Sequence, residues 1–100
     1  MHLFIRSVTV KHAASAAAAL QFAGEVCAYV NKTYQVNMRC GMEVFGHLRI
    51  HWLLDMDSAD AGMAMNQKMM GDAAYQALLG KGKDFWVKGS LKDKLIRLPR

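Results

Sequence analysis

A group of charged residues in the middle of the sequence has the types and the spacing to do acid–base chemistry. They occupy odd-numbered positions where most even-numbered positions are apolar: Arg39, Glu43, Arg49, His51 and Asp55. A histidine can take up or release a proton near neutral pH, and a carboxylate beside it fixes its tautomer and raises its basicity. We therefore predict His51 and Glu43 as catalytic residues.

The arginines of this group suit an anionic ligand. Arginine side chains bind carboxylates and stabilise enolate oxygens through charge-assisted hydrogen bonds. We predict that Arg39, Arg49 and Asp55 bind a ligand together with Arg6 of a neighbouring strand. The same residues could instead form cross-strand ion pairs that only fix strand register and dimer orientation, and the sequence leaves this structural alternative open.

Two strands must position these side chains. Apolar and polar residues alternate over residues 36–45 and again over residues 48–56, which is the pattern of strands with one buried face. Gly46 can adopt the left-handed conformation of a bulged hairpin, so we predict a three-residue loop at residues 46–48. This loop would pair Phe45 with Arg49, Glu43 with His51, Gly41 with Leu53 and Arg39 with Asp55.

Further strands are predicted on either side of this hairpin. Apolar and β-branched residues over residues 3–10 indicate a first strand, and because it is apolar on both sides we expect it to be central. We place Arg6 on the face opposite the helices and Ser7 beneath a helix. A last strand is predicted over residues 94–98. Before it, residues 85–87 predict a short strand or an aromatic flap that contacts a partner chain.

Two helices complete the set of elements. Alanine-rich residues 13–32 predict the first helix, with an apolar stripe formed by Ala13, Ala16, Ala17, Leu20, Ala23, Cys27 and Val30. The second helix begins at the N-cap Ser58 and ends at Gly80, with a weak point at Gly71. Its predicted inward residues are Met63, Met70, Ala74, Ala77 and Leu78.

The order of the elements is β-α-β-β-α-β, the split β-α-β plan of ferredoxin-like folds. Right-handed connections then give a four-stranded antiparallel sheet in the order fourth, first, third, second, with both helices on one face. The fold class is therefore α+β, and residues 1–100 are expected to form a single domain. The other face of the sheet is bare in one chain and would carry the charged group.

Composition predicts self-association and argues against a nucleic-acid partner. Hydrophobic residues make up 53% of the 100 positions, which suggests that a second copy covers part of the apolar surface. The net charge of +5 comes from residues 81–100, which hold seven Lys and Arg against two Asp and Glu. RNA-binding modules of this topology expose aromatic residues on their central strands, whereas Trp52 has the parity of the core. We therefore expect a homodimer that does not bind nucleic acid.

The spacing of possible ligands argues against a metal or a cofactor. His47 and His51 share a strand face, but four residues separate them by roughly 13 Å, too far to bind one ion. Cys27 and Cys40 lack metal-type spacing and are predicted to be buried, reduced thiols. No motif supports a haem or another cofactor.

The apolar run over residues 13–30 superficially resembles a membrane span. It is mostly alanine, which is only weakly apolar, and it contains Gln21 and Glu25. We therefore expect no membrane contact and a soluble, cytoplasmic protein.

Three stretches carry a resemblance to a known superfamily. They are His51-Trp52-Leu53-Leu54-Asp55, then Met69 to Leu78 with Gly71-Asp72 and Tyr75-Gln76, then Phe85 to Arg97 with Gly89-Ser90 and Asp93. In these stretches the chain resembles small bacterial proteins of the dimeric α+β-barrel superfamily, in particular NIPSNAP-like and related uncharacterised groups.

The resemblance implies a homodimer in which two sheets pack face to face and enclose a cavity. Members of the superfamily include cofactor-independent monooxygenases, haem-degrading enzymes, isomerases and cyclases. The chain matches no catalytic motif of a characterised subgroup, so the resemblance implies fold and dimerisation and assigns no active site.

These observations predict a small homodimeric α+β barrel that binds a small, anionic organic molecule on its charged inner sheet face. The sequence leaves open whether the protein is an enzyme. The alternatives are a non-catalytic interaction or assembly protein and a cofactor-independent monooxygenase-like or isomerase-like enzyme. An RNA-binding module is the function that the sequence favours least.

Overall fold

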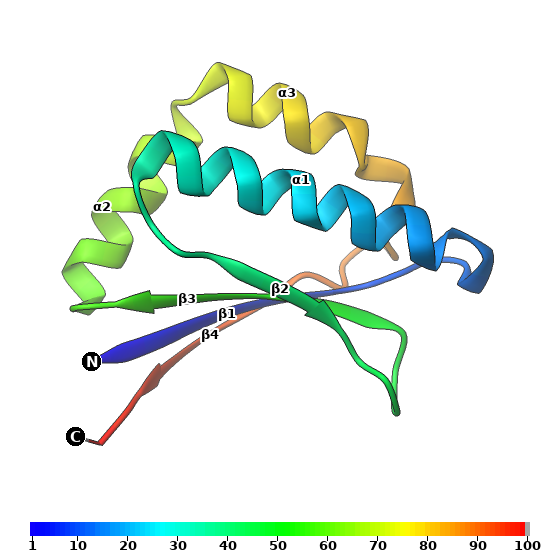
Figure 1. Ribbon diagram of the computed structural model, residues 1–100, viewed down its shortest axis with the longest axis horizontal. Helices are drawn as coiled ribbons and strands as arrows, with labels where there is room; N and C mark the ends of the chain where they lie inside the picture. Colours follow the sequence, from blue (N-terminus) through cyan, green and yellow to red (C-terminus); the bar gives the residue numbers. More distant parts are fainter. Residues whose placement is uncertain (100) are drawn as a thin grey trace.

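A four-stranded antiparallel sheet carries three α-helices on one face in the computed structural model of the protein, which describes residues 1–99 (Figure 1). The strands are β1 (His2–Thr9), β2 (Arg39–Met42), β3 (Arg49–Met56) and β4 (Lys92–Arg97). The helices are α1 (Ala16–Tyr34), α2 (Ala59–Met70) and α3 (Ala73–Lys81), with 3-10 turns at Ala13–Ser15 and Lys83–Phe85. The strand order β2-β3-β1-β4 confirms the predicted order and the α+β class.

Strand β1 lies between β3 and β4, as its apolar residues on both faces predicted. It pairs with β3 along its whole length, from His2 opposite Met56 to Thr9 opposite Arg49. Residues Ile50, Trp52 and Leu54 of β3 are buried beneath the helices, so their neighbours His51 and Leu53 lie on the open face. The sheet therefore has one helix-covered face and one open face.

Helix α1 packs on the covered face through small and branched side chains. Its buried residues are Ala19, Phe22, Ala23, Val26, Cys27 and Val30. The predicted stripe is correct at Ala23, Cys27 and Val30 but wrong at Ala13, Ala17 and Leu20, which are exposed. At the far end Gln35 takes a left-handed conformation, with φ of 58°, and its N–H donates to the carbonyl of Asn31. This turn leads the chain into β2.

The helical stretch Ala13–Tyr34 is long and apolar enough, by length and composition, to cross a membrane. In the folded chain, however, one side of α1 lies in the core over the sheet (Figure 1). A helix in the core of a soluble protein can have the same length and composition, so this stretch supports no membrane assignment on its own.

The predicted second helix is broken into α2 and α3 at its weak point. Ser58 caps α2 as predicted, and its hydroxyl accepts from the N–H of Ala61. After Gly71 the chain restarts with Asp72, whose carboxylate caps α3 through the N–H of Tyr75. The helix ends at Lys81, one residue beyond the predicted stop at Gly80.

The break changes which side chains face inward. Met63 and Met70 were predicted to be inward but are each 68% exposed, and Ala74 and Ala77 are exposed as well. Met65 and Met69 pack against the core instead, and only Leu78 of the predicted set does so. A single helical stripe cannot continue through Gly71, because the axis of the helix changes there.

The hairpin of β2 and β3 does not have the predicted three-residue loop. Arg39 pairs with Leu53 and Gly41 with His51, a register shifted by two residues, and the chain between Met42 and Arg49 lies outside the strands. Val44 and Phe45 are 86% and 92% exposed in this longer loop. A shift of two keeps every side chain on its face, so alternation could not distinguish the two registers.

The segment after α3 forms part of the core. Trp86 makes an isolated bridge with Val10, and its ring centroid lies 6.0 Å from that of Trp52 and 6.2 Å from that of Phe22. Residues 85–87 therefore form neither a strand nor a free flap, and Phe85 and Trp86 contact their own chain. Val87 remains exposed.

Candidate functional site

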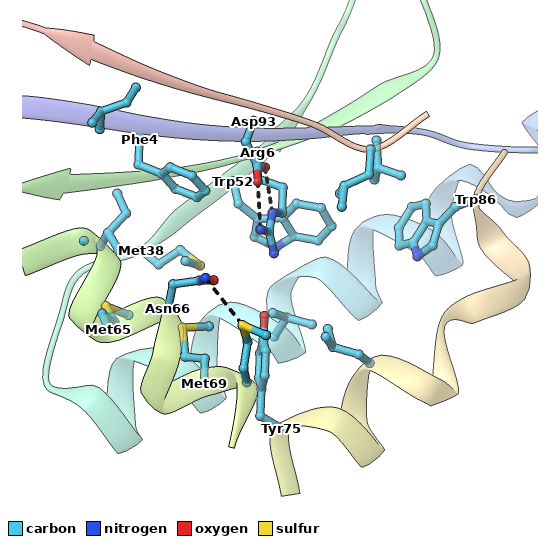
Figure 2. Close-up of a pocket in the computed structure, with 18 of the residues that line it drawn as sticks. Phe4, Arg6, Met38, Trp52, Met65, Asn66, Met69, Tyr75, Trp86 and Asp93 are labelled. Atoms are coloured by element: carbon cyan, nitrogen blue, oxygen red, sulfur yellow. Dashed lines mark hydrogen bonds and ion pairs between the residues drawn. The ribbon is translucent and has the colours of Figure 1, made fainter. Parts of the chain in front are cut away.

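A cleft of about 1000 Å³ lies between the covered face of the sheet and helices α2 and α3. Figure 2 shows aromatic and methionine side chains converging on it from the strands and from both helices. Strand β4 is exposed along its whole length, so the cleft opens over β1 and β4. Its main lining residues are Phe4, Arg6, Trp52, Met65, Asn66, Met69, Tyr75, Leu79, Trp86, Asp93 and Leu95.

An ion pair lies on the floor of this cleft. Arg6 and Asp93 are cross-strand neighbours, and the Arg6 Nε and Nη2 atoms donate to the two carboxylate oxygens at 2.8 and 2.9 Å. The hydrogen bond to Asp93 raises the pKa of Arg6, while partial burial opposes this. The Arg6 guanidinium also lies 5.7 Å from the centroid of the Phe4 ring. The cleft therefore contains a fixed cation whose charge is largely balanced.

The position of Arg6 corrects two sequence predictions. Arg6 pairs with Trp52 and shares the parity of Val8, so it lies on the covered face, and Ser7 lies on the open face. The prediction had them the other way round. It was wrong because both faces of β1 carry apolar residues, so alternation in β1 alone does not identify the covered side. Phe4 and Arg97 have the covered parity as well.

Tyr75 supplies a free hydroxyl group to the cleft. Its side chain is only 6% exposed, and its ring stacks on that of Tyr29 at 6.1 Å between centroids. Its hydroxyl forms no hydrogen bond with any residue from 1 to 99, and Figure 2 shows the ring extending from α3 toward Arg6. Burial raises the pKa of Tyr75, with Arg6 opposing, so the phenol stays protonated and can donate.

Six of the eight methionines line the same cleft, namely Met38, Met56, Met63, Met65, Met69 and Met70. Methionine is flexible and polarisable, and its sulfur makes favourable contacts with aromatic rings. The sequence predicted these residues as adaptable core filling, and Met65 and Met69 do pack against the core. Together the methionines form an adaptable wall.

Asp72 fixes one end of this wall. Besides capping α3, its carboxylate accepts from the hydroxyls of Tyr29 and Tyr34 at 2.8 and 2.7 Å. The phenol of Tyr34 is the main cause of the lowered pKa of Asp72. Because both tyrosines belong to α1, the hydrogen bonds tie the break between α2 and α3 to the first helix.

The predicted catalytic pair lies on the open face, away from the cleft. His51 Nε2 lies 2.7 Å from Glu43 Oε1, and Arg49 Nε donates to the same oxygen at 2.6 Å. The hydrogen bond from Arg49, and then that of His51, lowers the pKa of Glu43. On the other side of the ring, Nδ1 lies 2.6 Å from the hydroxyl of Ser7. Sequence reasoning missed Ser7 because it was assigned to the covered face.

The predicted charged group is therefore divided. Glu43, Arg49 and His51 form one cluster, whereas Arg39 and Asp55 form a separate pair at 3.6 Å that is about half exposed. Arg6 lies on the opposite side of the sheet. The sequence analysis named Tyr75 and Asp93 only within the stretches that carry the resemblance and gave neither a role in a site, and the pairing of Asp93 with Arg6 follows only from the register of β1 and β4.

The described residues hold no cluster of three metal-ligating side chains. Cys27 and Cys40 are free thiols, and burial, helped by the neighbouring Cys40, raises the pKa of Cys27 to about 12. Cys27 therefore remains protonated at neutral pH and is no nucleophile.

No family model matches this sequence, and no curated protein matches it either. Among solved structures, a NIPSNAP family protein of unknown function from Agrobacterium tumefaciens superposes with a TM-score of 0.83. The identity is 18%, over 100% of this chain and 89% of that chain. An uncharacterised NIPSNAP domain protein from Burkholderia xenovorans has a TM-score of 0.82 and 14% identity, over 99% and 95% of the chains.

A further structural match is an oxygenase. SnoaB, a cofactor-independent oxygenase from Streptomyces nogalater, matches with a TM-score of 0.69 and 11% identity, covering 99% of this chain and 93% of that one. At such identities the likeness concerns the fold alone. The chain thus has the ferredoxin-like α+β fold found in NIPSNAP family proteins and in this oxygenase, which confirms the predicted resemblance at the level of fold.

Proposed function

We propose that the protein binds a small, mainly apolar organic molecule with one oxygen acceptor in the cleft between the sheet and helices α2 and α3. The observation that carries this proposal is the hydroxyl of Tyr75, which has no hydrogen-bond partner among residues 1–99 and lies in a cavity of about 1000 Å³ lined by aromatic and methionine side chains. Cavities of this size hold drug-sized molecules, and a few polar groups among apolar walls orient them.

The chemistry of the walls indicates the class of ligand. Trp52, Trp86 and Phe4 offer ring surfaces, and the methionines can adjust to a flat aromatic molecule. Asp93 balances the charge of Arg6 on the floor of the cleft, so the position beside Tyr75 favours a carbonyl or phenolic oxygen over a strongly charged group. Lys11, Lys83 and Lys88 also line the cleft. This revises the position of the ligand expected from the sequence.

We propose binding, and not catalysis by His51 and Glu43, as the role of the cleft. These two side chains lie on the open face, and β3 itself separates them from a molecule held against Trp52. An acid–base step in the cleft would therefore need groups other than the predicted pair.

Two naphthalene probes test the proposal. 2-Acetylnaphthalene has a carbonyl acceptor, whereas 2-ethylnaphthalene has nearly the same shape without it. Titration calorimetry should show that both probes bind and that Tyr75→Phe weakens only the acetyl probe, by about two- to tenfold, the worth of one hydrogen bond. Equal weakening of both probes would contradict a hydrogen bond from Tyr75.

A second pair of variants tests the location. Asn66 of α2 lines the cleft, whereas Ala64 of the same helix is exposed and does not. Asn66→Trp should fill the cleft and abolish probe binding, and Ala64→Trp should leave it unchanged. Unchanged binding in Asn66→Trp would place the probes elsewhere and remove the basis of the proposal.

We also propose that the protein is a homodimer that associates through part of the open face. Four apolar side chains share this face at one end of the sheet, Leu3, Ile5, Leu53 and Ile96. A strip of this kind is a normal self-association surface. Native mass spectrometry should find a dimer that Ile5→Lys converts to a monomer, whereas Leu20→Lys on α1 should not.

The same experiments address the alternative functions. A dimer that binds neither probe would favour an assembly protein without a ligand. A dimer purified with added mass would identify a ligand directly, and an oxidised product of that ligand would favour an enzyme. A monomer with unchanged probe binding would contradict the dimer and leave the cleft proposal intact.

A further inference from the structure

A second, smaller cavity of about 280 Å³ lies on the open face, and its lining shares only Val87, Lys88 and Gly89 with the cleft on the other face. It occupies the end of the sheet where β1 finishes and β3 begins, away from the apolar strip at Leu3 and Ile5. Its lining residues are Ser7, Thr9, Arg49, Val87, Lys88, Gly89, Ser90 and Lys92.

The charged side chains that line this cavity are all positive. Lys88, Lys92 and Arg49 contribute three cations, and none of the lining residues is an acid. Neither lysine forms an ion pair with any residue of the described range 1–99. Arg49 is held by Glu43 through Nε and Nη2, which leaves its remaining N–H groups without a protein partner in that range. The cavity thus has an unbalanced positive potential.

Hydrogen bonds fix the polar rim. Ser90 Oγ accepts from the N–H of Thr9 at 3.1 Å and donates to the carbonyl of Val87 at 2.6 Å. The N–H of Ser90 donates to the same carbonyl of Val87. Gly89, which lies between Val87 and Ser90 in the chain, has a φ of 79°, which a residue with a side chain rarely adopts. This turn holds Lys88 beside the strands and gives the cavity a defined wall.

We propose that this cavity binds a tetrahedral oxyanion, such as a phosphate or sulfate group, either free or at the end of a small molecule. Three cations and the hydroxyls of Ser7 and Thr9 offer charge-assisted and neutral hydrogen bonds to such a group. The volume leaves room for a short organic substituent. This site goes beyond the proposed function, because it needs neither the cleft nor its ligand.

A chain of hydrogen bonds runs from Glu43 through His51 to Ser7. It links binding of the oxyanion to the protonation state of the His51 ring. A carboxylate only accepts, so His51 Nε2 carries a hydrogen toward Glu43. When the ring is neutral, Nδ1 can only accept, and the hydroxyl of Ser7 donates to it. When the ring is protonated, Nδ1–H donates to Ser7, whose own hydrogen is then free to reach an oxyanion.

The charged groups around the His51 ring set the direction of this coupling. Glu43 faces it at 2.7 Å, Arg49 lies behind Glu43, and Lys92 pairs with Ser7 on the far side. A bound oxyanion adds negative charge beside the ring and favours its protonated form. Anion affinity should therefore be higher when the ring is protonated than when it is neutral, and measurements over the range of about pH 5 to 8 test this.

Amide NMR of the purified protein in its native assembly tests the site. Sulfate is the probe, since its charge is constant across this range, and chloride keeps the ionic strength fixed. Addition of sulfate should shift the amides of Ser7, Thr9, Gly89 and Ser90 in a saturable way, with a several-fold lower Kd at the acid end of the range. Absence of saturable shifts would overturn the proposal.

Matched lysine variants distinguish sulfate binding at a defined site from general electrostatic attraction. Lys92 and Lys94 lie on the same face of β4, but only Lys92 lines the cavity. Lys92→Gln should weaken sulfate binding about tenfold, the worth of one charge-assisted hydrogen bond, whereas Lys94→Gln should change it less than about twofold. Equal weakening by both variants would mean that sulfate responds only to net charge, against the proposal.

Two further experiments test the role of His51 protonation and the source of the anion. His51→Gln should remove the pH dependence of sulfate binding while binding itself persists, and a pH-independent wild-type affinity would contradict the coupling through Ser7. Phenyl phosphate that binds more tightly than inorganic phosphate would support a phosphorylated small molecule as ligand. Equal affinities would support the free anion.

Discussion

The covered and open faces of the sheet place polar groups in different surroundings, although both faces are built from alternate residues of the same strands. On the covered face one ion pair, Arg6 with Asp93, lies among aromatic and methionine side chains. On the open face Glu43 contacts both Arg49 and His51, and a nearby cavity is lined by Lys88 and Lys92, which form no ion pair within residues 1–99. The first arrangement suits an apolar ligand with one oxygen, and the second suits an anion.

The difference shows how exposure sets the cost of a charge. The side chains of Arg6 and Asp93 remain 29% and 43% exposed, because the cleft is open over β4. They therefore avoid most of the desolvation that a fully buried pair would incur. A ligand that closes the cleft would remove this water, so the bidentate geometry of the pair matters most in the bound state.

The largest predicted contrast between the faces is in stability. Trp52 is buried in the core and its indole N–H donates to the carbonyl of Ala23, whereas His51 is partly exposed on the open face and forms hydrogen bonds with Ser7 and Glu43. Trp52→Ala should lower the free energy of unfolding by about 3–5 kcal/mol. His51→Ala should cost far less. Urea titrations of both variants measure this, and equal losses would show that the open-face cluster is as important as the core.

A single added methyl group sharpens the contrast. A Cβ at Gly82 would meet the ring of Phe22 beneath the end of α3, whereas a Cβ at Gly41 on the open face has nothing within 4 Å. Gly82→Ala should therefore destabilise the protein by about 1–3 kcal/mol through overpacking. Gly41→Ala should stay within about 0.5 kcal/mol. Thermal unfolding compares the two, and a large loss at Gly41 would mean that a second copy already covers that position.

The smallest predicted effect concerns acid stability. Glu43 on the open face and Asp72 on the helical side both have a lowered pKa, so each stabilises the folded state above the unfolded carboxyl pKa of about 4. That stability is lost as the pH falls through the lower folded values. Urea midpoints measured from about pH 5 to about pH 3 should therefore decrease.

Two amide variants show how much of this pH dependence comes from Glu43 on the open face and how much comes from Asp72 on the helical side. Asp72→Asn should remove more of the pH dependence than Glu43→Gln, because Asp72 accepts hydrogen bonds from two phenols and a backbone N–H. A larger effect of Glu43→Gln would reverse this order and make the open face the main acid-sensitive region.

Much of the fold followed from local patterns. Alternation in β3 identified its buried residues, Ser58 identified the start of α2, and Gly71 identified the break. Contacts between Glu43 and His51 and between Arg39 and Asp55 were also predicted, although they occur across a shifted register. These features depend on periodicity and on residue-specific conformational preference, which a sequence records directly.

The candidate sites followed less well, because they depend on which face of β1 is covered. Residues of both parities in β1 are apolar, so the placement of Arg6 and Ser7 was reversed. That reversal concealed both the cleft pair of Arg6 with Asp93 and the contact of Ser7 with His51. Neither partner can be found from the spacing of residues along one strand.

By itself, the sequence determined the order of elements, the strand order and the face of each residue in β3, since these follow from hydrophobic periodicity and from the handedness of connections. Only the tertiary structure decided the hairpin register, the covered face of β1 and the free hydroxyl of Tyr75 in a cleft. The physical reason is that alternation repeats every two residues, so a shift of two leaves the sequence pattern unchanged. The shift nevertheless changes which side chains meet.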